Sequence, residues 1–277
     1  MTRSLRAEEV PMFQTAQPHP AVQFGADAPV DTLRDLAEET PVAMVFDGSS
    51  AAVMMASPAD IEDFAYGFAR TEGFVETLGD IADFEQVAHP NGIEARFWLR
   101  ADRSQPLAER RRAMMGPIGC GLCGIDSLDQ ALRSLSSVAN VPLQMPRARV
   151  AGATTALAAH QPLHDQCRAV HAAGFLCPDQ GLIVVREDVG RHNALDKLIG
   201  ALLRQGIDPA RGAMVMTSRI SVDLVQKATQ VGCAMIVAVS APTSHAVRIA
   251  AEAGVTLAAS ARDGRFALYS RADRVTG

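Results

Sequence analysis

Short apolar runs alternate with longer amphipathic runs between residues 181 and 270, and this alternation restricts the possible folds more than any other feature. Short apolar runs bounded by turn residues are typical of buried strands, whereas the longer runs have helical length and spacing. Strands that alternate with helices form a parallel or mixed sheet covered by helices, so the sequence predicts an α/β fold. We expect strands at 181–185, 213–216, 234–239, 256–259 and 266–269, and helices at 193–203, 222–231 and 244–253.

The N-terminal half has the mixed pattern of an α+β domain. Asp47-Gly48 is a typical hairpin turn between apolar runs at 42–46 and 51–55. Ser57 is expected to be the N-cap of a helix over 59–72, because serine accepts a hydrogen bond from a free N–H of the first turn. A further strand is expected at 95–99.

The chain divides into three expected parts. Residues 1–28 contain Pro11, Pro18 and Pro20 with little periodicity, so we expect a loose tail there and ordered structure that begins near Val30. A smaller α+β domain then covers 29–140, and the α/β domain covers 141–277.

Composition limits the partners of the chain. A net charge of −5 over 277 residues argues against general nucleic-acid binding. Residues 1–20 lack the apolar centre of a secretory signal, and no apolar run approaches the roughly 20 residues of a membrane helix. We therefore expect a cytoplasmic protein with reduced cysteines and with neither a membrane nor a nucleic-acid partner.

Two cysteines, Cys120 and Cys123, lie in the glycine-rich run 119–124. Glycine allows unusual backbone angles, so such a loop can bring a thiol to a partner and move it away. The run 125–135 that follows has helical spacing, and three arginines at 110–112 precede the pair. A helix N-terminus and nearby cations both favour thiolate, so the sequence predicts a reactive, mobile cysteine pair.

Three other roles for this pair compete with that interpretation. A structural zinc site needs a second pair of ligands, but the remaining cysteines are scattered. A thioredoxin-like redox pair follows a buried strand, whereas residues 109–115 are basic and polar. A structural disulfide is disfavoured by the odd number of cysteines, which is five, and by the absence of any sign of an oxidising compartment. We expect no bound metal.

Polar residues gather where three of the expected strands end, at 186–192, 217–221 and 240–245. Open α/β sheets bind ligands at the carboxyl ends of their strands, and free N–H groups at helix N-termini bind phosphate. Arg262 and Arg265 add two guanidinium groups in a later turn, which suit phosphate geometry. The sequence therefore predicts a pocket for a large phosphorylated ligand. Helix capping by Asp188 or Asn193, and a solvated face at 196–197, are the structural alternatives.

Five motifs resemble those of the FdhD/NarQ family, the formate dehydrogenase accessory sulfurtransferases, and they occur in the family's order. The resemblance runs from Val30 to Ser270. The motifs are GCGLCG at 119–124, EDVGRHNALDK at 187–197, TSRIS at 217–221, SAPTSHA at 240–246 and RDGRFALYS at 262–270. The chain departs from the family where Ala259-Ser260 replaces the usual Gly-Phe.

The resemblance implies a function for the cysteine pair. A cysteine desulfurase would pass sulfur to Cys120 as a persulfide, with Cys123 as the partner thiol. The chain would then transfer that sulfur to the molybdenum or tungsten of bis(molybdopterin guanine dinucleotide), the substrate, for use by formate dehydrogenase. The family is homodimeric, and its C-terminal domain is a cytidine-deaminase-like three-layer α/β domain.

The resemblance also implies that the C-terminal domain binds the cofactor, with GDP-like nucleotides as fragments of it. Together with the strand-end positions, the candidate cofactor-binding residues are Ser260, Ala261, Arg262, Asp263, Gly264, Arg265, Arg191, His192, Arg219, Ser240 and Thr243.

Three other functional classes compete with this one. A zinc deaminase needs a His-x-Glu motif, but His171 is followed by two alanines, so the catalytic acid is absent. A cofactor chaperone that only binds and delivers would not need Cys120. A CxxC thiol oxidoreductase would use both thiols without a nucleotide pocket.

Overall fold

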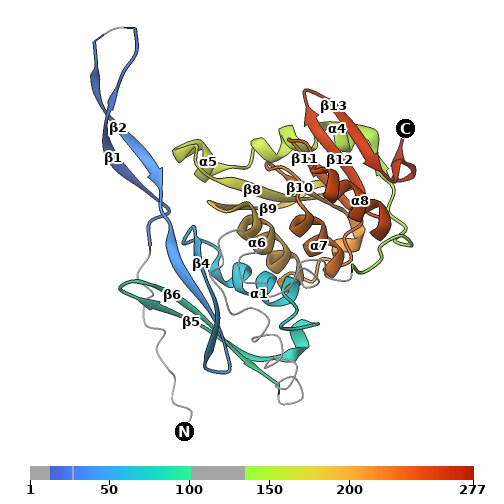
Figure 1. Cartoon of the computed structure of the whole chain (residues 1–277), viewed down its shortest axis with the longest axis horizontal. Coiled ribbons are helices and arrows are strands. Elements are labelled where there is room, and N and C mark those ends of the chain that lie inside the picture. The colour runs from blue at the N-terminus through green and yellow to red at the C-terminus, as the bar shows by residue number, and fades with distance from the viewer. Residues whose placement is uncertain (1–12, 27, 101–134) are drawn as a thin grey trace.

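The computed structural model describes residues 13–26, 28–100 and 135–277, which form a mixed α/β structure with a large and a small sheet packed through helices (Figure 1). This confirms the predicted α/β class. The cysteine pair, Cys120 and Cys123, lies outside the described residues.

The large sheet has six strands in the order β13-β12-β11-β10-β8-β9. Strands β10, β11 and β12 are parallel to one another, whereas β13 and β8 run antiparallel to their neighbours. Since β9 is antiparallel to β8, it runs in the same direction as β10. The strands are β8 (His171–Cys177), β9 (Gly181–Asp188), β10 (Ala213–Met216), β11 (Met235–Ala238), β12 (Thr256–Arg262) and β13 (Arg265–Ser270).

Helices cover both faces of this sheet (Figure 1). All residues of β10 and β11 are buried. Because alternate side chains of a strand point to opposite sides, both faces of these strands are covered. On one side Val215 and Val237 pack against α4 (Arg147–Ala158). On the other, Met214 and Ile236 pack toward α6 (Arg191–Arg204), α7 (Val222–Gln230) and α8 (Ser244–Ala253). These are three layers. The likeness to cytidine deaminases stays a prediction.

The small sheet has the order β4-β3-β6-β5 and is covered by α1 (Ile61–Thr71). Its strands are β3 (Thr40–Phe46), β4 (Ser49–Ala56), β5 (Ile81–His89) and β6 (Gly92–Leu99). Asp47 and Gly48 have φ angles of 47° and 76°, as a two-residue hairpin turn requires, which confirms the predicted turn. The expected helix is also present, but its N-cap is Asp60 rather than Ser57. Ser57 instead hydrogen-bonds to Asp188 of β9.

Helices α1 and α6 join the two sheets through a contact between their backbones. A Cβ atom at Gly67 would lie 1.8 Å from the carbonyl oxygen of Asp196, and one at Gly200 would lie 1.8 Å from that of Asp63. Only glycine fits at either position. The close approach lets side chains beside the crossing reach across it, and it makes the two sheets one packed body.

The expectation that order begins near Val30 is wrong. Strand β1 (Ala16–Gln23) pairs with β2 (Val30–Ala37) in a two-stranded ribbon that projects from the body (Figure 1). Pro18 and Pro20 did not prevent this strand. They are two residues apart, so their nitrogens lie on the same edge, and because proline cannot donate to β2, that edge is the outer one.

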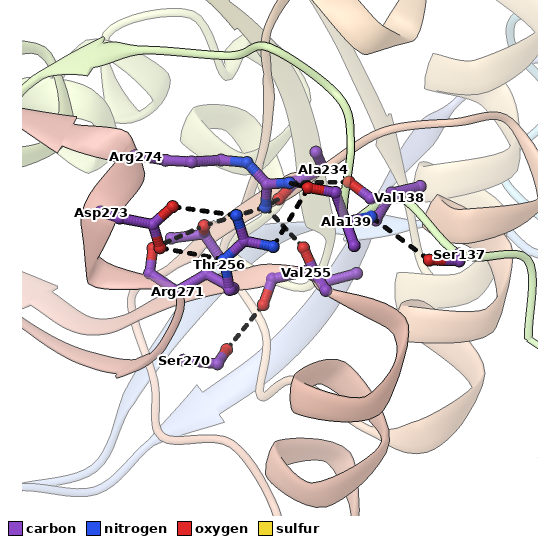
Figure 2. Close-up of polar contacts among 11 residues, drawn as sticks. Ser137, Val138, Ala139, Ala234, Val255, Thr256, Ser270, Arg271, Asp273 and Arg274 are labelled. Carbon is purple, nitrogen blue, oxygen red and sulfur yellow. Dashed lines mark hydrogen bonds and ion pairs between the residues drawn. The ribbon is translucent and has the colours of Figure 1, made fainter.

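The C-terminal end is fixed by a buried arginine (Figure 2). Arg274 is 1% exposed and donates to the carbonyl oxygens of Val138 at 2.7 Å and of Ala234 at 3.2 Å. The remaining short elements are α5 (Pro162–Cys167), β7 (Met145–Pro146), β14 (Val275–Thr276) and the 3₁₀ turns Leu78–Asp80, Pro209–Arg211 and Ala272–Arg274. No helix of the described segments is long and apolar enough to cross a membrane.

Candidate functional site

The carboxyl ends of β9, β10, β11 and β12 lie at one edge of the large sheet, because these four strands share a direction. Backbone hydrogen bonds connect the segments that follow β10, β11 and β12. The N–H of Val239 donates to Met216 at 3.0 Å, and that of Thr243 donates to Ile220 at 3.0 Å. The N–H of Ser260 donates to the carbonyl oxygen of Ser240 at 3.3 Å. These three segments therefore lie side by side, and the segment after β9 reaches them where His192 lies beside Asp223 of α7 (Val222–Gln230). We call this region the carboxyl edge.

Helix α6 begins at the carboxyl edge with Arg191 and His192, both partly exposed. Its N-cap is Gly190, and no side chain caps the first turn, so that turn keeps backbone donors for a ligand. Ser240 is also partly exposed, and Arg219 after β10 is exposed. Hydroxyl, guanidinium and amide donors in this arrangement suit an anionic ligand.

Two residues omitted from the predicted site join it. His171, the first residue of β8, places its Nδ1 3.2 Å from the Thr217 hydroxyl oxygen. Burial lowers the pKa of His171, and the charges of Arg191 and His192 lower it further. Asp223 Oδ2 lies 3.6 Å from His192 Nε2. The sequence analysis did not predict strand β8. Because β8 runs antiparallel to β10, its first residue, His171, lies at the carboxyl end of β10.

Asp223 and His192 form a half-buried acid–base pair at the carboxyl edge. Burial acts to raise the pKa of Asp223, but the nearby His192 and a backbone donor bring it below its usual value. This keeps a negative charge beside His192.

The segment 260–265 divides into exposed and buried positions. Ser260 has a φ of 52° at an irregularity of β12, and its side chain is exposed. Ala261 is buried, and its carbonyl oxygen accepts a hydrogen bond from Thr154. Arg262 is exposed, and its Nε donates to Val239 at 3.2 Å. Asp263, Gly264 and Arg265 lie at the exposed turn into β13.

Thr243 has a structural role within the same edge. It is the N-cap of α8, and its hydroxyl accepts a hydrogen bond from the N–H of Ala246 at 3.2 Å. Its hydroxyl is therefore partly committed to the helix. The other predicted positions that have exposed or partly exposed polar groups at this edge are Arg191, His192, Arg219, Ser240, Ser260 and Arg262.

Most polar residues of the 187–197 motif are turned inward. The Asp188 carboxylate is fully buried, lies 2.7 Å from Lys197 Nζ and accepts a hydrogen bond from the N–H of Gly190 at 2.8 Å. Asp196 is 2% exposed and pairs with Lys227 at 2.9 Å. Neither Asp188 nor Asn193 caps the first turn of α6, so the capping alternative is wrong. The alternative of a solvated face at 196–197 is also wrong, because both side chains are buried.

The described cysteines lack the features of a reactive thiol. Burial raises the pKa of Cys233 to about 11, although backbone hydrogen bonds oppose the shift. Burial also raises the pKa of Cys177, and Cys167 donates to a carbonyl oxygen of its own helix. Within the described residues no three His, Cys, Asp or Glu side chains are placed to hold a metal ion.

Comparison with known proteins gives consistent matches. The sequence model of the FdhD/NarQ family matches residues 37–276. A sulfur carrier protein FdhD of Agrobacterium fabrum is 46% identical over 242 residues, which covers 87% of this chain and 89% of that protein. A protein of the same name from Cupriavidus necator is 39% identical and covers 95% of this chain and 96% of its own length.

A solved structure has the same fold. The crystal structure of a putative formate dehydrogenase accessory protein from Desulfotalea psychrophila superposes with a TM-score of 0.78 at 23% identity. The match covers 95% of this chain and 100% of that chain. At that identity the likeness shows the fold alone.

Proposed function

Because the chain belongs to the FdhD/NarQ family, we propose that it is a sulfur carrier that serves a formate dehydrogenase. In this proposal it receives sulfur from a cysteine desulfurase as a persulfide on Cys120. It then transfers the sulfur to the molybdenum or tungsten of bis(molybdopterin guanine dinucleotide). The expected homodimer and cytoplasmic location belong to the same proposal.

The observation that carries the proposal is the family match over residues 37–276, a range that includes Cys120 and Cys123. The relatives that match over most of their length are named sulfur carriers. The described cysteines have raised pKa values or an internal hydrogen bond, which leaves the glycine-flanked pair as the better candidates for exchange.

The proposed chemistry consists of two exchanges at sulfur. The Cys120 thiolate attacks the outer sulfur of the desulfurase persulfide, the S–S bond breaks, and the desulfurase cysteine leaves as a thiolate. In the second exchange the outer sulfur becomes a sulfide ligand of the metal, the metal gives up two electrons, and Cys120 leaves as a thiolate. Cys123 helps to release the sulfur or protects it.

The carboxyl edge suits the nucleotide part of the substrate. Its donors are the uncapped first turn of α6 and the guanidinium groups of Arg191, Arg219 and Arg262. The acidic residue nearest to this turn, Asp188, is turned inward and paired with Lys197, so its charge is compensated. We propose that pyrophosphate and guanine groups bind here, and that GDP binds as a fragment.

Mass spectrometry tests the sulfur-carrier proposal. After incubation of the full chain with a cysteine desulfurase and cysteine, the Cys120 peptide should gain the mass of one sulfur atom, which a reductant removes. The Cys123→Ala variant is the matched control and should still accept sulfur at Cys120. A Cys120 thiol that stays unmodified would favour a chaperone or a thiol oxidoreductase instead.

A further inference from the structure

Ser57, in the junction between β4 and α1, hydrogen-bonds through all three of its polar groups to residues between the end of β9 and the second turn of α6. It is fully buried. Its N–H donates to Asp188 Oδ2 at 3.0 Å, and its hydroxyl accepts from the N–H of Val189 at 3.1 Å. Its carbonyl oxygen accepts from Lys197 Nζ at 2.9 Å. A residue of the N-terminal part therefore holds the loop that leads into the carboxyl edge.

The Asp188 carboxylate passes this connection to the first turn of α6. Its Oδ1 accepts from the N–H of Gly190 at 2.8 Å and from Asn193 Nδ2 at 3.0 Å. Asn193 Nδ2 also donates to the carbonyl oxygen of Met55 at 2.8 Å. The loop thus has two connections to the end of β4, one through Ser57 and one through Asn193.

The loop has little room to move against this network. A Cβ atom at Gly190 would lie 3.0 Å from Asn193 Nδ2 and 3.4 Å from Asp188 Oδ1. The next two residues, Arg191 and His192, are partly exposed at the carboxyl edge. Any shift of the loop therefore moves their side chains and the free N–H groups of the first turn.

We infer that Ser57 is a positioning residue for the ligand site: through Val189 and Asp188 it holds the start of α6 in the geometry that binds a phosphorylated ligand. The inference rests on the proposed function of the carboxyl edge. It assigns the N-terminal part a share in nucleotide affinity although Ser57, being buried, does not touch the ligand.

The test compares two variants that each remove one buried hydroxyl from the interface between the N-terminal part and α6. Ser57→Ala removes the acceptor of Val189. Thr71→Val is the matched control, because the Thr71 hydroxyl lies 2.8 Å from Asp196 Oδ1, in the buried network around Lys227 rather than at the first turn of α6. Both variants should lower Tm by a similar amount.

Titration calorimetry with GDP, well below both Tm values, separates the two. Ser57→Ala should weaken GDP binding roughly threefold to tenfold, the range that one hydrogen bond supplies. Thr71→Val should leave the affinity unchanged. Ser57→Thr, which keeps the hydroxyl, should bind GDP as tightly as the unmodified chain. If Ser57→Ala does not fold, Asn193→Ala interrupts the second connection and should weaken GDP binding in the same way.

Two outcomes overturn the inference alone, given GDP binding by the unmodified chain. One is an unchanged affinity in Ser57→Ala, or in Asn193→Ala where that variant is used. The other is an equal loss of affinity in Thr71→Val, which would show general loosening of the interface. An unmodified chain that binds no GDP overturns the proposed ligand site and this inference together.

Discussion

Of the substitutions whose effect on stability can be worked out from the structure, replacement of Lys227 has the largest effect. Its ammonium group lies 2.9 Å from both oxygens of the Asp196 carboxylate, 2.9 Å from Glu72 Oε1 and 2.9 Å from the Thr71 hydroxyl. These partners come from α6 and from the C-terminal end of α1, where Glu72 is the C-cap, whereas Lys227 is on α7. Replacing Lys227 with methionine keeps most of the apolar stem and removes the charge.

The expected loss of stability is about 3–5 kcal/mol, the usual cost of leaving a buried partner charge uncompensated. Asp196 is 2% exposed, so water screens little of that cost. The free energy of unfolding of an ordinary domain is about 5–15 kcal/mol, so the variant loses a large share of its stability. The matched control is Arg96→Met, because Arg96 pairs with Glu94 on a surface where an ion pair contributes roughly 0–1 kcal/mol.

Urea denaturation at several pH values provides the assay. Burial raises the pKa of Asp196, and removing the cation raises it further. Below this raised pKa, the folded variant binds a proton at Asp196 that the unfolded chain, with a pKa of about 3.9, still releases. A state that binds more protons is favoured as pH falls. The stability difference between the variant and the unmodified chain should therefore shrink as pH falls from 8 toward about 3.9, by at most about 1.4 kcal/mol per pH unit.

Two results would refute this reasoning. One is a Lys227→Met variant within about 1 kcal/mol of the unmodified chain, and the other is a deficit that does not change with pH. Adding Asp196→Asn to Lys227→Met should recover much of the loss, because the uncompensated charge is then gone. A double variant less stable than Lys227→Met would place the cost in packing instead of charge.

Three further predictions concern the helix crossing, the carboxyl edge and the cysteine pair. Gly200→Ala should lower the free energy of unfolding by at least about 1–3 kcal/mol, because its Cβ would meet the α1 backbone, whereas Gly152→Ala in α4, with open space around it, should raise it by up to about 1 kcal/mol in the same urea assay. Arg262→Ala with Arg265→Ala should weaken GDP binding at least about tenfold by calorimetry, which corresponds to 1.4 kcal/mol, and an unchanged affinity would move the nucleotide elsewhere. Cys120→Ala should abolish formate dehydrogenase maturation in cells at an unchanged Tm, and normal maturation would contradict the sulfur-carrier proposal.

The sequence predicted correctly those helices and strands whose ends depend on residues next to them in the chain. The helix predicted at 244–253 has the same bounds in the structure, because Thr243 caps its first turn and Gly254 ends it with a φ of 78°. Strand β8 was missed. Its residues 172–174 are small and have weak strand preference, and the strand forms because β9 and β10 pair with it on both sides.

Long-range pairs explain the errors at the site. Ser57 followed by Pro58 has the local pattern of a helix N-cap, but the serine hydroxyl is used by Val189, far along the chain. The strand-end segments were predictable, because chain direction alone brings carboxyl ends together. Which of their polar groups turn inward depends on Lys197 and Asp188 meeting the end of β4, and no local pattern indicates that.

The prolines of the β1–β2 ribbon bear on how the protein behaves at high concentration. The ribbon carries several of the most exposed large apolar side chains of the described residues, among them Phe24 at 77% and Leu33 at 67%. Such a ribbon is a template for fibrous stacking, in which strands of successive molecules add to a free edge. Pro18 and Pro20 remove two consecutive outward donors from β1, so an incoming strand cannot form a continuous ladder there. Pairing is thereby limited to the β2 edge. Two molecules that pair through their β2 edges leave only β1 edges outside, so the stack ends at two molecules.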